Sequence, residues 1–562
     1  MTLIDPKHLE AAFVPADTPS FAQLIDRLPH THLSATRRRD LASGLRRVAK
    51  ALGKPCDGVF ADPGWLRPRL DKIVPVAIGV SDKSWSNALS DTRAAMKLFG
   101  VVQPRPNRAA DLGDAWRPLW EALLADDGPT LAPALGRFVR FLDRCGVAPE
   151  AVAQSHAEAF REAVALNEIR RSPETAMTAA IYGWNKAVER IDGWPRQRLS
   201  VTPRGNRYAL DLDRFPVTFR DEVATWLSSL ERPDLLDDTA PTAPLRPATI
   251  RHRRAQVLRF ASALVHDGVP IAEVGSLSML VHPDLAERGL RWMLARNGGR
   301  SSPGIADTAV MLKVVARTHV RPPAEDLERI DRLAVRLAVP VQKGMTFKNR
   351  ERLRAVQDAE ALRRLLRVPS RLFERADGLS GRKAALDREV ALAIALLLQC
   401  PVRRRNLVET RFDTTLVRPG DGRVFLLFEE EEVKNRRRIE FELRPKVVAM
   451  LDRHLENRSP ALCPSTTPWL FPGRDGAAPM DASFLSRKVG AAIRKEAGLE
   501  FNPHLFRHLT AMIWLGRNPG SYEAVRRILG HAELSSTLDA YAGFEAGSAA
   551  TRFAELLEEI LG

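Results

Sequence analysis

The spacing of apolar residues predicts helices over most of the first 410 residues. In the segment 33–53 the apolar residues recur at three- and four-residue intervals, which places them on one face of a helix. Further helical patterns cover about 115–195 and the residues from Thr249 onward. The apolar positions of the first segment are Leu41, Leu45, Val48 and Leu52.

The pattern changes after about residue 350. The run 424–428 is apolar, and 439–443 alternates apolar and polar residues with a period of two, so the pair predicts a β-hairpin. The apolar run 390–400 is about half the length that crosses a bilayer, and we interpret it as a buried helix. The predicted fold class is mainly α: helical N-terminal domains, then a mostly α domain with a small antiparallel β-sheet.

A chain of 562 residues is too long for one ordinary core. Residues 232–247 are rich in Pro, Thr and Asp and predict an extended linker, and 341–351 is a short basic linker. We therefore predict a helical domain at 1–110, a second at 111–231, a third at 248–340 and a C-terminal domain at 352–562.

Two of the helical blocks share a local pattern. Residues 135–152 align without a gap to 257–274, and the two segments share Arg-Phe, a later Leu, Gly-Val and a final Val. The match suggests two related helical domains. The alternative is that a sequence pattern of this kind, a helix followed by Gly-Val, recurs in unrelated helical hairpins.

The chain is basic, with a formal charge of +16 and a pI near 10.1. This balance favours a polyanionic partner, either nucleic acid or an anionic membrane surface, although surplus arginines can also simply solvate a surface. We expect no membrane insertion. The residues that we expect to contact DNA lie at the start of the third block and in the basic linker: Arg251, Arg253, Arg254, Lys343 and Lys348.

The four cysteines lie far apart and form neither a CxxC pair nor a Cys/His ligand spacing, so we predict no disulfide framework and no metal site. The N-terminus lacks the charged and apolar regions of a secretory signal. We expect a cytoplasmic protein associated with the bacterial nucleoid.

A set of chemically active residues lies in the last 160 positions. Arg403 follows the buried helix, Lys434 lies in or near the hairpin turn, and Tyr541 lies near the C-terminus. Each alone has an ordinary interpretation: an ion pair, a solvated edge charge or a core phenol. The histidines of the sequence HLFRH could form a metal pair, but no third ligand is evident. The remaining members of the set are His504, Arg507, His508 and His531.

The order and spacing of this set resemble the tyrosine recombinase family, also called phage-type integrases. That family has an Arg followed by an acid or Asn and a Leu, a hairpin Lys, His-x-x-Arg, Leu-Gly-His and a Tyr about nine residues later. The resemblance covers about 350–562, and 248–340 resembles the core-binding domain of the family. Here Asn406 replaces the more common acid, Arg404 is an alternative to Arg403, and Tyr541 follows the last histidine by ten residues.

The resemblance implies a site-specific recombinase, the integrase of a mobile element, that cuts and rejoins double-stranded DNA through a 3′-phosphotyrosine. Tyr541 would be the nucleophile and His504 its proton acceptor, because a free tyrosine is about 0.1% ionised at neutral pH. Arg403 and Arg507 would hold the phosphate with help from His531, and Lys434 would protonate the leaving oxygen. Asn406 and His508 would support these residues, and no metal or other cofactor is required.

The resemblance also implies a homo-tetramer on paired DNA sites, and an accessory DNA-bending protein is compatible with it. The terminal segment 548–562 is amphipathic and is predicted to dock on a neighbouring subunit, the alternative being that it folds back on its own domain. Two other functions use the same pattern: a type IB topoisomerase-like or hairpin-forming resolvase activity, and a catalytically inactive DNA-binding regulator.

Overall fold

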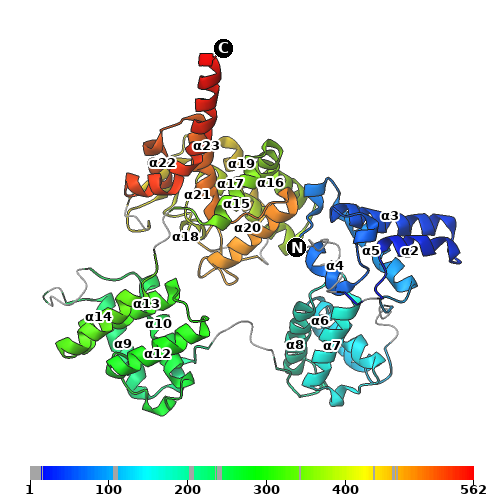
Figure 1. The fold of residues 1–562 in the computed structure, drawn as a ribbon, viewed down its shortest axis with the longest axis horizontal. Coiled ribbons are helices and arrows are strands. Elements are labelled where there is room, and N and C mark those ends of the chain that lie inside the picture. The colour runs from blue at the N-terminus through cyan, green and yellow to red at the C-terminus, as the bar shows by residue number, and fades with distance from the viewer. Residues whose placement is uncertain are drawn as a thin grey trace, which may run out of the picture. The chain divides into compact units, whose positions relative to one another are not determined.

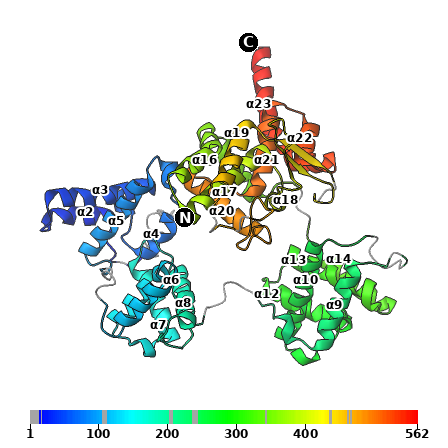
Figure 2. The same cartoon turned by 180° about the vertical axis from the view of Figure 1, so that it is seen from behind.

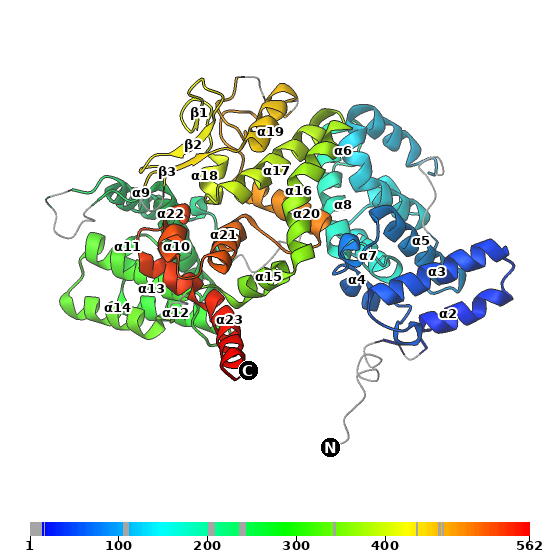
Figure 3. The same cartoon turned by 90° about the horizontal axis from the view of Figure 1, so that it is seen from above.

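The computed structural model divides into two compact units, Met1–Val201 with Lys343–Gly562, and Thr202–Gln342. Both consist largely of helices (Figures 1, 2 and 3). Among the described residues, no helix combines the length and the apolar character needed to cross a membrane. The structure describes residues 14–15, 17–104, 112–200, 208–234, 236, 243–340, 344–433, 437–458, 462–463 and 466–561.

The first helical block has its own apolar core. Helix α3 confirms the helix predicted at 33–53: Ser34 caps its first turn and the predicted apolar face is turned inward. Its helices are α2 (Phe21–Arg27), α3 (Ala35–Ala51), α4 (Pro63–Leu70) and α5 (Asp82–Leu98), with short 3-10 turns η1 (Leu28–His30), η2 (Cys56–Gly58) and η3 (Pro75–Ile78).

The second block packs around a group of tryptophans. Trp184 is fully buried, and its ring meets those of Trp116 and Trp194 edge to face, with centroids 6.2 and 5.2 Å apart. Its elements are α6 (Arg117–Arg144), η5 (Pro149–Ala151), α7 (Gln154–Asn167) and α8 (Pro173–Arg190).

The unit Thr202–Gln342 starts earlier than the linker predicted at 232–247. Helix α9 turns Phe219 and Trp226 into the same core as Phe260 of α10, because its apolar face needs a partner there. The described residues on the two sides of the predicted linker, 208–234 and 243–340, therefore belong to one unit. Its elements are η6 (Leu212–Arg214), α9 (Val217–Glu231), α10 (Pro247–His266), η7 (Ile271–Glu273), α11 (Leu277–Leu280), α12 (Pro283–Arg296), α13 (Pro303–Val315), the π-helical turn η8 (Ala316–Val320) and α14 (Ala324–Leu337).

The two segments that align in sequence also fold alike. In each, a long helix ends at a glycine with positive φ, Gly146 (68°) or Gly268 (98°), and a 3-10 turn follows. The amide after each glycine donates to the carbonyl five residues earlier, and both hydrogen bonds measure 3.0 Å. This shared helix end supports the proposal of two related domains.

The C-terminal domain is mostly α with a three-stranded antiparallel sheet of order β1–β2–β3, as predicted. The hairpin strands β2 (Phe425–Phe428) and β3 (Ile439–Glu442) confirm the alternating pattern, while the two-residue β1 (Leu416–Val417) was not expected. The helices are α15 (Phe347–Gln357), α16 (Ala359–Asp377), α17 (Gly381–Gln399), α18 (Arg404–Val408), α19 (Pro445–Glu456), α20 (Ala482–Ala497), α21 (Pro503–Arg517), α22 (Tyr522–Leu529) and α23 (Leu534–Leu561).

The C-terminal segment belongs to one long helix. The sequence suggested a separate final helix at 548–562, but α23 runs continuously from Leu534 to Leu561 and so carries Tyr541 as well. Its last turns project beyond the neighbouring helices in all three views (Figures 1–3). Residues 553–561 are all exposed, so they do not fold back onto their own domain.

Candidate active site

Arg403 stands at the junction of a buried helix and a short one. Helix α17 is almost wholly buried, and the chain leaves it through Cys400 and Pro401. Arg403 is the N-cap residue of α18 and is half-buried. Its charge lowers the pKa of His504, Arg507 and His531, whereas Arg404 is exposed and acts only on the pKa of His504. Arg403 is thus the more central of the two.

Helix α21 presents three polar residues of the site. Pro503 occupies its first position, and the Asn502 side chain accepts hydrogen bonds from the amides of His504 and Leu505, which fixes the start of the helix. His504 lies on this first turn and is exposed. His508 follows one turn later and is buried, and the two imidazole rings meet edge to face with centroids 4.7 Å apart.

Arg507 is anchored by backbone carbonyls. Only 3% of its surface is exposed; Nη1 donates to Pro401 O at 2.7 Å and Nη2 to Leu529 O at 2.6 Å. One guanidinium therefore ties the start of α18 to the end of α22. Burial, with Arg403 nearby, lowers its pKa to about 10, so it remains charged at neutral pH.

A glycine turn positions His531. Gly530 ends α22 with φ of 59°, and a Cβ at this position would lie 2.8 Å from Ile439 Cδ1 of β3, so both the conformation and the close approach require glycine. The next residue, His531, has Nδ1 2.9 Å from Thr537 Oγ1. Because Thr537 is fully buried on α23, this contact fixes the orientation of the imidazole.

Tyr541 lies on α23, one turn after Thr537, with 2% of its surface exposed. Its hydroxyl is 3.1 Å from His508 Nδ1, and its ring is parallel to that of His531, with an angle of 2° and centroids 6.3 Å apart. His508, for which we expected a supporting role, is therefore the histidine in contact with the phenol. His504, the expected proton acceptor, contacts the His508 ring instead.

The electrostatics of the site favour an anion. Burial, followed by the neighbouring cations, lowers the pKa of His531 to about 4 and that of His508 to about 3. His504 is exposed overall, but the part of its ring that the site covers and the neighbouring arginines lower its pKa as well. Burial raises the pKa of Tyr541 to about 12, against the opposing effect of Arg507. All the charges that act on the three histidines are positive, so at neutral pH the imidazoles are neutral beside two guanidiniums.

The segment that follows β2 contacts α18. Asn406 is buried, and its Nδ2 donates to Glu432 O at 3.1 Å, so α18 is tied to the segment after β2. Among the described residues, the supporting contact of Asn406 is therefore with the backbone that follows β2. The expected general acid, Lys434, lies outside the described residues.

Of the predicted residues, the structure brings together His504, Arg507, His508, His531 and Tyr541, with Arg403 adjacent. Sequence reasoning missed Thr537. The signal in the sequence that could have indicated Thr537 is its position four residues before Tyr541. If this segment is a helix, Thr537 and Tyr541 lie on the same face of it.

The expected DNA contacts are of two kinds. Arg251, Arg254 and Lys348 are exposed. Arg253 is half-buried; its Nη1 donates to Gln256 Oε1 at 3.2 Å, and burial lowers its pKa. The Arg253 side chain therefore packs along its own helix and contacts Gln256. Lys343 lies outside the described residues.

Comparison with known proteins identifies the domain. Residues 370–546 match the model of the phage integrase family. Over these residues the match confirms the predicted family and the activity of a tyrosine-type site-specific recombinase. The helices and the small antiparallel sheet of this domain confirm the predicted fold class. No curated protein matches the chain.

Solved structures with a similar fold have low identity. A XerH site-specific recombinase in a post-cleavage complex with palindromic difH substrate is 16% identical, covering 55% of this chain and 80% of its own, with a TM-score of 0.35. The XerA recombinase is 17% identical over 56% and 90%, with a TM-score of 0.23. A lambda integrase dimer bound to a COC′ core site is 15% identical over 66% and 88%, with a TM-score of 0.34.

Proposed function

We propose that this chain, whose residues 370–546 belong to the phage integrase family, cuts and rejoins duplex DNA by attack of Tyr541 on a phosphodiester. The observation that carries the proposal is the contact of Tyr541 with His508 and His531 beside the anchored Arg507. A buried phenol surrounded by neutral imidazoles and cations is suited to receive an anionic phosphate and to attack it.

Arg507 and Arg403 would bind the non-bridging oxygens of the phosphate. A guanidinium has five N–H groups, and the two carbonyl contacts of Arg507 use two of them. The other three remain for the phosphate, in an orientation that the carbonyls already fix. Loss of one such donor typically costs about 10²–10³ in rate.

His508 would accept the proton of Tyr541. With a pKa of about 12, only about one Tyr541 in 10⁵ is ionised at neutral pH, so attack needs a base. His508 already contacts the hydroxyl. The negative charge of a bound phosphodiester would raise the low pKa of this imidazole, so the base becomes stronger when the substrate is present. His531, held by Thr537, would hydrogen-bond to the phosphate.

Lys434 would donate the proton to the departing 5′-oxygen. The support for this role is its place in the chain: it follows directly on the segment that Asn406 fixes to α18. The product would be a 3′-phosphotyrosine and a free 5′-hydroxyl, so the energy of the broken bond is kept for rejoining.

The exposed end of α23 supports assembly of several copies. Its large apolar side chains are exposed and would stay in contact with water in a single subunit. We infer that this segment docks on a second copy in a homo-tetramer on two DNA sites, in the service of a mobile element. The residues are Phe553 (64%), Leu556 (53%), Leu557 (42%), Ile560 (74%) and Leu561 (85%).

The test is covalent trapping on nicked duplex DNA taken from beside the gene. The intact protein is expected to form a protein–DNA adduct that resists denaturing electrophoresis, and Tyr541→Phe is expected to form none. Tyr182→Phe is the matched control, because Tyr182 is 62% exposed on α8 of the second block. An adduct that survives Tyr541→Phe would exclude this nucleophile.

A plasmid with two target sites separates recombination from the topoisomerase-like alternative. Resolution or integration of the sites supports a recombinase, whereas relaxation without exchange supports a topoisomerase. Absence of an adduct on this DNA, with the protein still bound to it, would favour the inactive regulator.

A further inference from the structure

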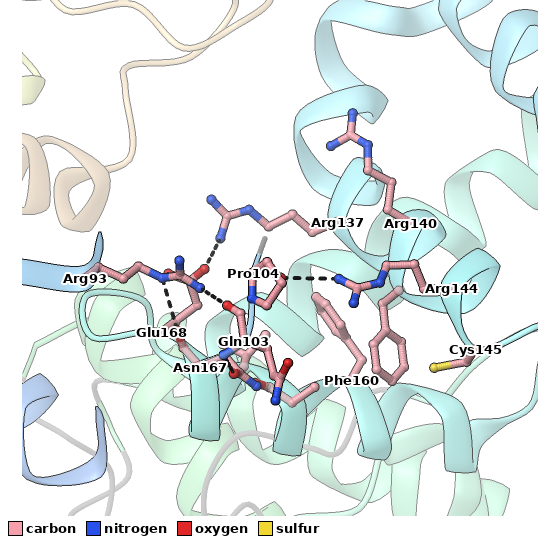
Figure 4. Close-up of a pocket in the computed structure, with 13 residues that line it drawn as sticks. Arg93, Gln103, Pro104, Arg137, Arg140, Arg144, Cys145, Phe160, Asn167 and Glu168 are labelled. Atoms are coloured by element: carbon pink, nitrogen blue, oxygen red, sulfur yellow. Dashed lines mark hydrogen bonds and ion pairs between the residues drawn. The ribbon is translucent and has the colours of Figure 1, made fainter. Parts of the chain in front are cut away.

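A cleft of about 480 Å³ opens between the first and second helical blocks, apart from the site described above (Figure 4). Helices α5, α6 and α7 and residues 103–104 form its walls. The lining carries four guanidiniums and one carboxylate, so its charge is unbalanced unless an anion enters. These residues are Arg93, Arg137, Arg140, Arg144 and Glu168.

Glu168 balances one side of the cleft. Its carboxylate lies 3.9 Å from Arg93 Nε and 3.7 Å from Arg137 Nη1. Arg93 also donates to the carbonyls of Asn167 (3.2 Å) and Gln103 (3.0 Å), and both Arg93 and Glu168 are buried. These contacts fix this wall of the cleft, and its charges largely compensate one another.

Arg140 and Arg144 form the other side. They lie one turn apart on α6, on the same face as Arg137. Arg144 Nη1 donates to Pro104 O at 3.3 Å, which is long for such a bond. Arg140 Nε is buried and, within the part of the chain that the structure describes, has no hydrogen-bond partner. Two planar guanidiniums with N–H groups to spare match the oxygens of a phosphate.

The floor of the cleft is aromatic. Phe141 and Phe160 lie side by side with ring centroids 5.5 Å apart, and Val164 adjoins them. Figure 4 shows the Phe160 ring below the side chains of Arg137 and Arg140. A phosphate alone would leave this surface in water, whereas a flat ring attached to the phosphate would cover it.

The related helix end in the other unit shows what this face can hold. In the gap-free alignment, Arg140 and Arg144 correspond to Ser262 and His266. There, His266 Nε2 lies 2.9 Å from Tyr208 O, and the two rings pack edge to face with centroids 6.2 Å apart. The chain places its own aromatic residue at that face. In the second block, arginines occupy the matching positions.

We propose that this arginine cleft binds a nucleoside 5′-phosphate, with the phosphate on Arg140 and Arg144 and the base against Phe141 and Phe160. The volume falls in the range of sites for small molecules of this size. The same chemistry can come from a free nucleotide or from the 5′-phosphorylated end of a DNA single strand. The site does not depend on the recombinase chemistry of Tyr541.

Isothermal titration of the full chain tests the proposal with three probes: thymidine 5′-monophosphate, inorganic phosphate and a 5′-phosphorylated dT tetranucleotide. The double variant R140Q/R144Q is expected to bind about 10²-fold more weakly, because two charge-assisted hydrogen-bonding groups are lost. Arg161→Gln is the matched control: it lies on α7 outside the lining, within 3.9 Å of Glu174.

The probes separate the sources. If the parent protein binds the mononucleotide and the double variant does not, the ligand is a free nucleotide. If only the tetranucleotide shows this difference, the ligand is a DNA end. Binding of phosphate as tight as that of the nucleotide, equal binding by the double variant, or no binding at millimolar concentration would overturn the proposal. If the double variant unfolds, Arg140→Gln alone, at a residue whose Nε has no hydrogen-bond partner among the described residues, is expected to weaken binding about tenfold.

Discussion

Glu389 gives a prediction whose size follows from its surroundings. It lies in the middle of α17, the helix that leads to Arg403, and is fully buried. Within the described residues neither of its carboxylate oxygens has a hydrogen-bond partner. Burial raises its pKa from 4.5 to about 8, although the charge of Arg458 acts in the opposite direction. The folded protein therefore keeps this side chain protonated at neutral pH.

The sign of the pH effect follows from linkage. Between pH 4.5 and 8 the folded state holds the proton and the unfolded state releases it, so the stability of the domain falls as pH rises. Above pH 8 both states are ionised and the whole penalty is present. The difference between the two pKa values corresponds to an upper limit of about 5 kcal/mol.

Glu389→Gln removes this penalty, because glutamine has the same shape and no charge. At pH 5 the variant and the parent should unfold at nearly the same temperature. At pH 8.5 the variant should be more stable by several kcal/mol, and 1 kcal/mol shifts the melting temperature of a domain of this size by about 2–4 °C. Scanning calorimetry at the two pH values measures the difference, since the other titrating groups are present in both proteins.

Glu360→Gln is the control, because Glu360 is an exposed carboxylate on α16, 2.9 Å from Arg363 Nη1. It should shift the melting temperature equally and only slightly at both pH values. If Glu389→Gln gave the same shift at pH 5 and pH 8.5, the carboxylate would have to be ionised in the folded protein. The reasoning from burial would then be refuted.

Two further predictions concern the site and a third concerns DNA binding. Arg507→Lys should lower the rate of adduct formation on nicked DNA by about 10²–10³, since the three N–H groups of an ammonium lie on one atom and do not reproduce the planar fork that holds two carbonyls and leaves further donors for the phosphate; an unchanged rate would exclude its role. Thr537→Val should lower that rate about tenfold by releasing His531, with little change in DNA affinity, and an equal loss of affinity would mean a merely structural role. DNA affinity, measured by fluorescence anisotropy, should fall by about 10³ or more between 50 and 200 mM salt if at least six phosphates are neutralised; a flat response would contradict backbone binding.

Much of the fold follows from local sequence. The periodicity at 33–53 and the alternation at 439–443 each predict an element that forms, because in both cases one face is buried by a nearby core. The start of the unit at Thr202 could not be predicted in this way. Proline and threonine at 232–247 indicate an extended segment, but they do not show whether α9 packs with the helices that precede this segment or with those that follow it.

The order of motifs predicted which residues meet, but not which atoms touch. The motif placed His504 next to Tyr541 as its base, while the structure puts His508 on the hydroxyl. The reason is helix geometry: His508 lies one turn further along α21, on the part that α23 covers, whereas His504 on the first turn stays exposed. Burial of this kind depends on the partner helix and is not written in the local sequence.

The ten-residue interval between His531 and Tyr541 is explained by the same geometry. Residues within a helix are fixed in direction at about 100° per residue, so an extra residue inside α23 would turn Tyr541 away from His508. The contacts of Thr537 and Tyr541, four residues apart on one face, keep that direction. The chain can take up an extra residue only before Leu534, where the helix begins. The interval that positions the nucleophile is therefore the four residues from Thr537 to Tyr541, which lie within one helix. The interval counted from His531 also includes the loop before Leu534, and that loop can accommodate one residue more.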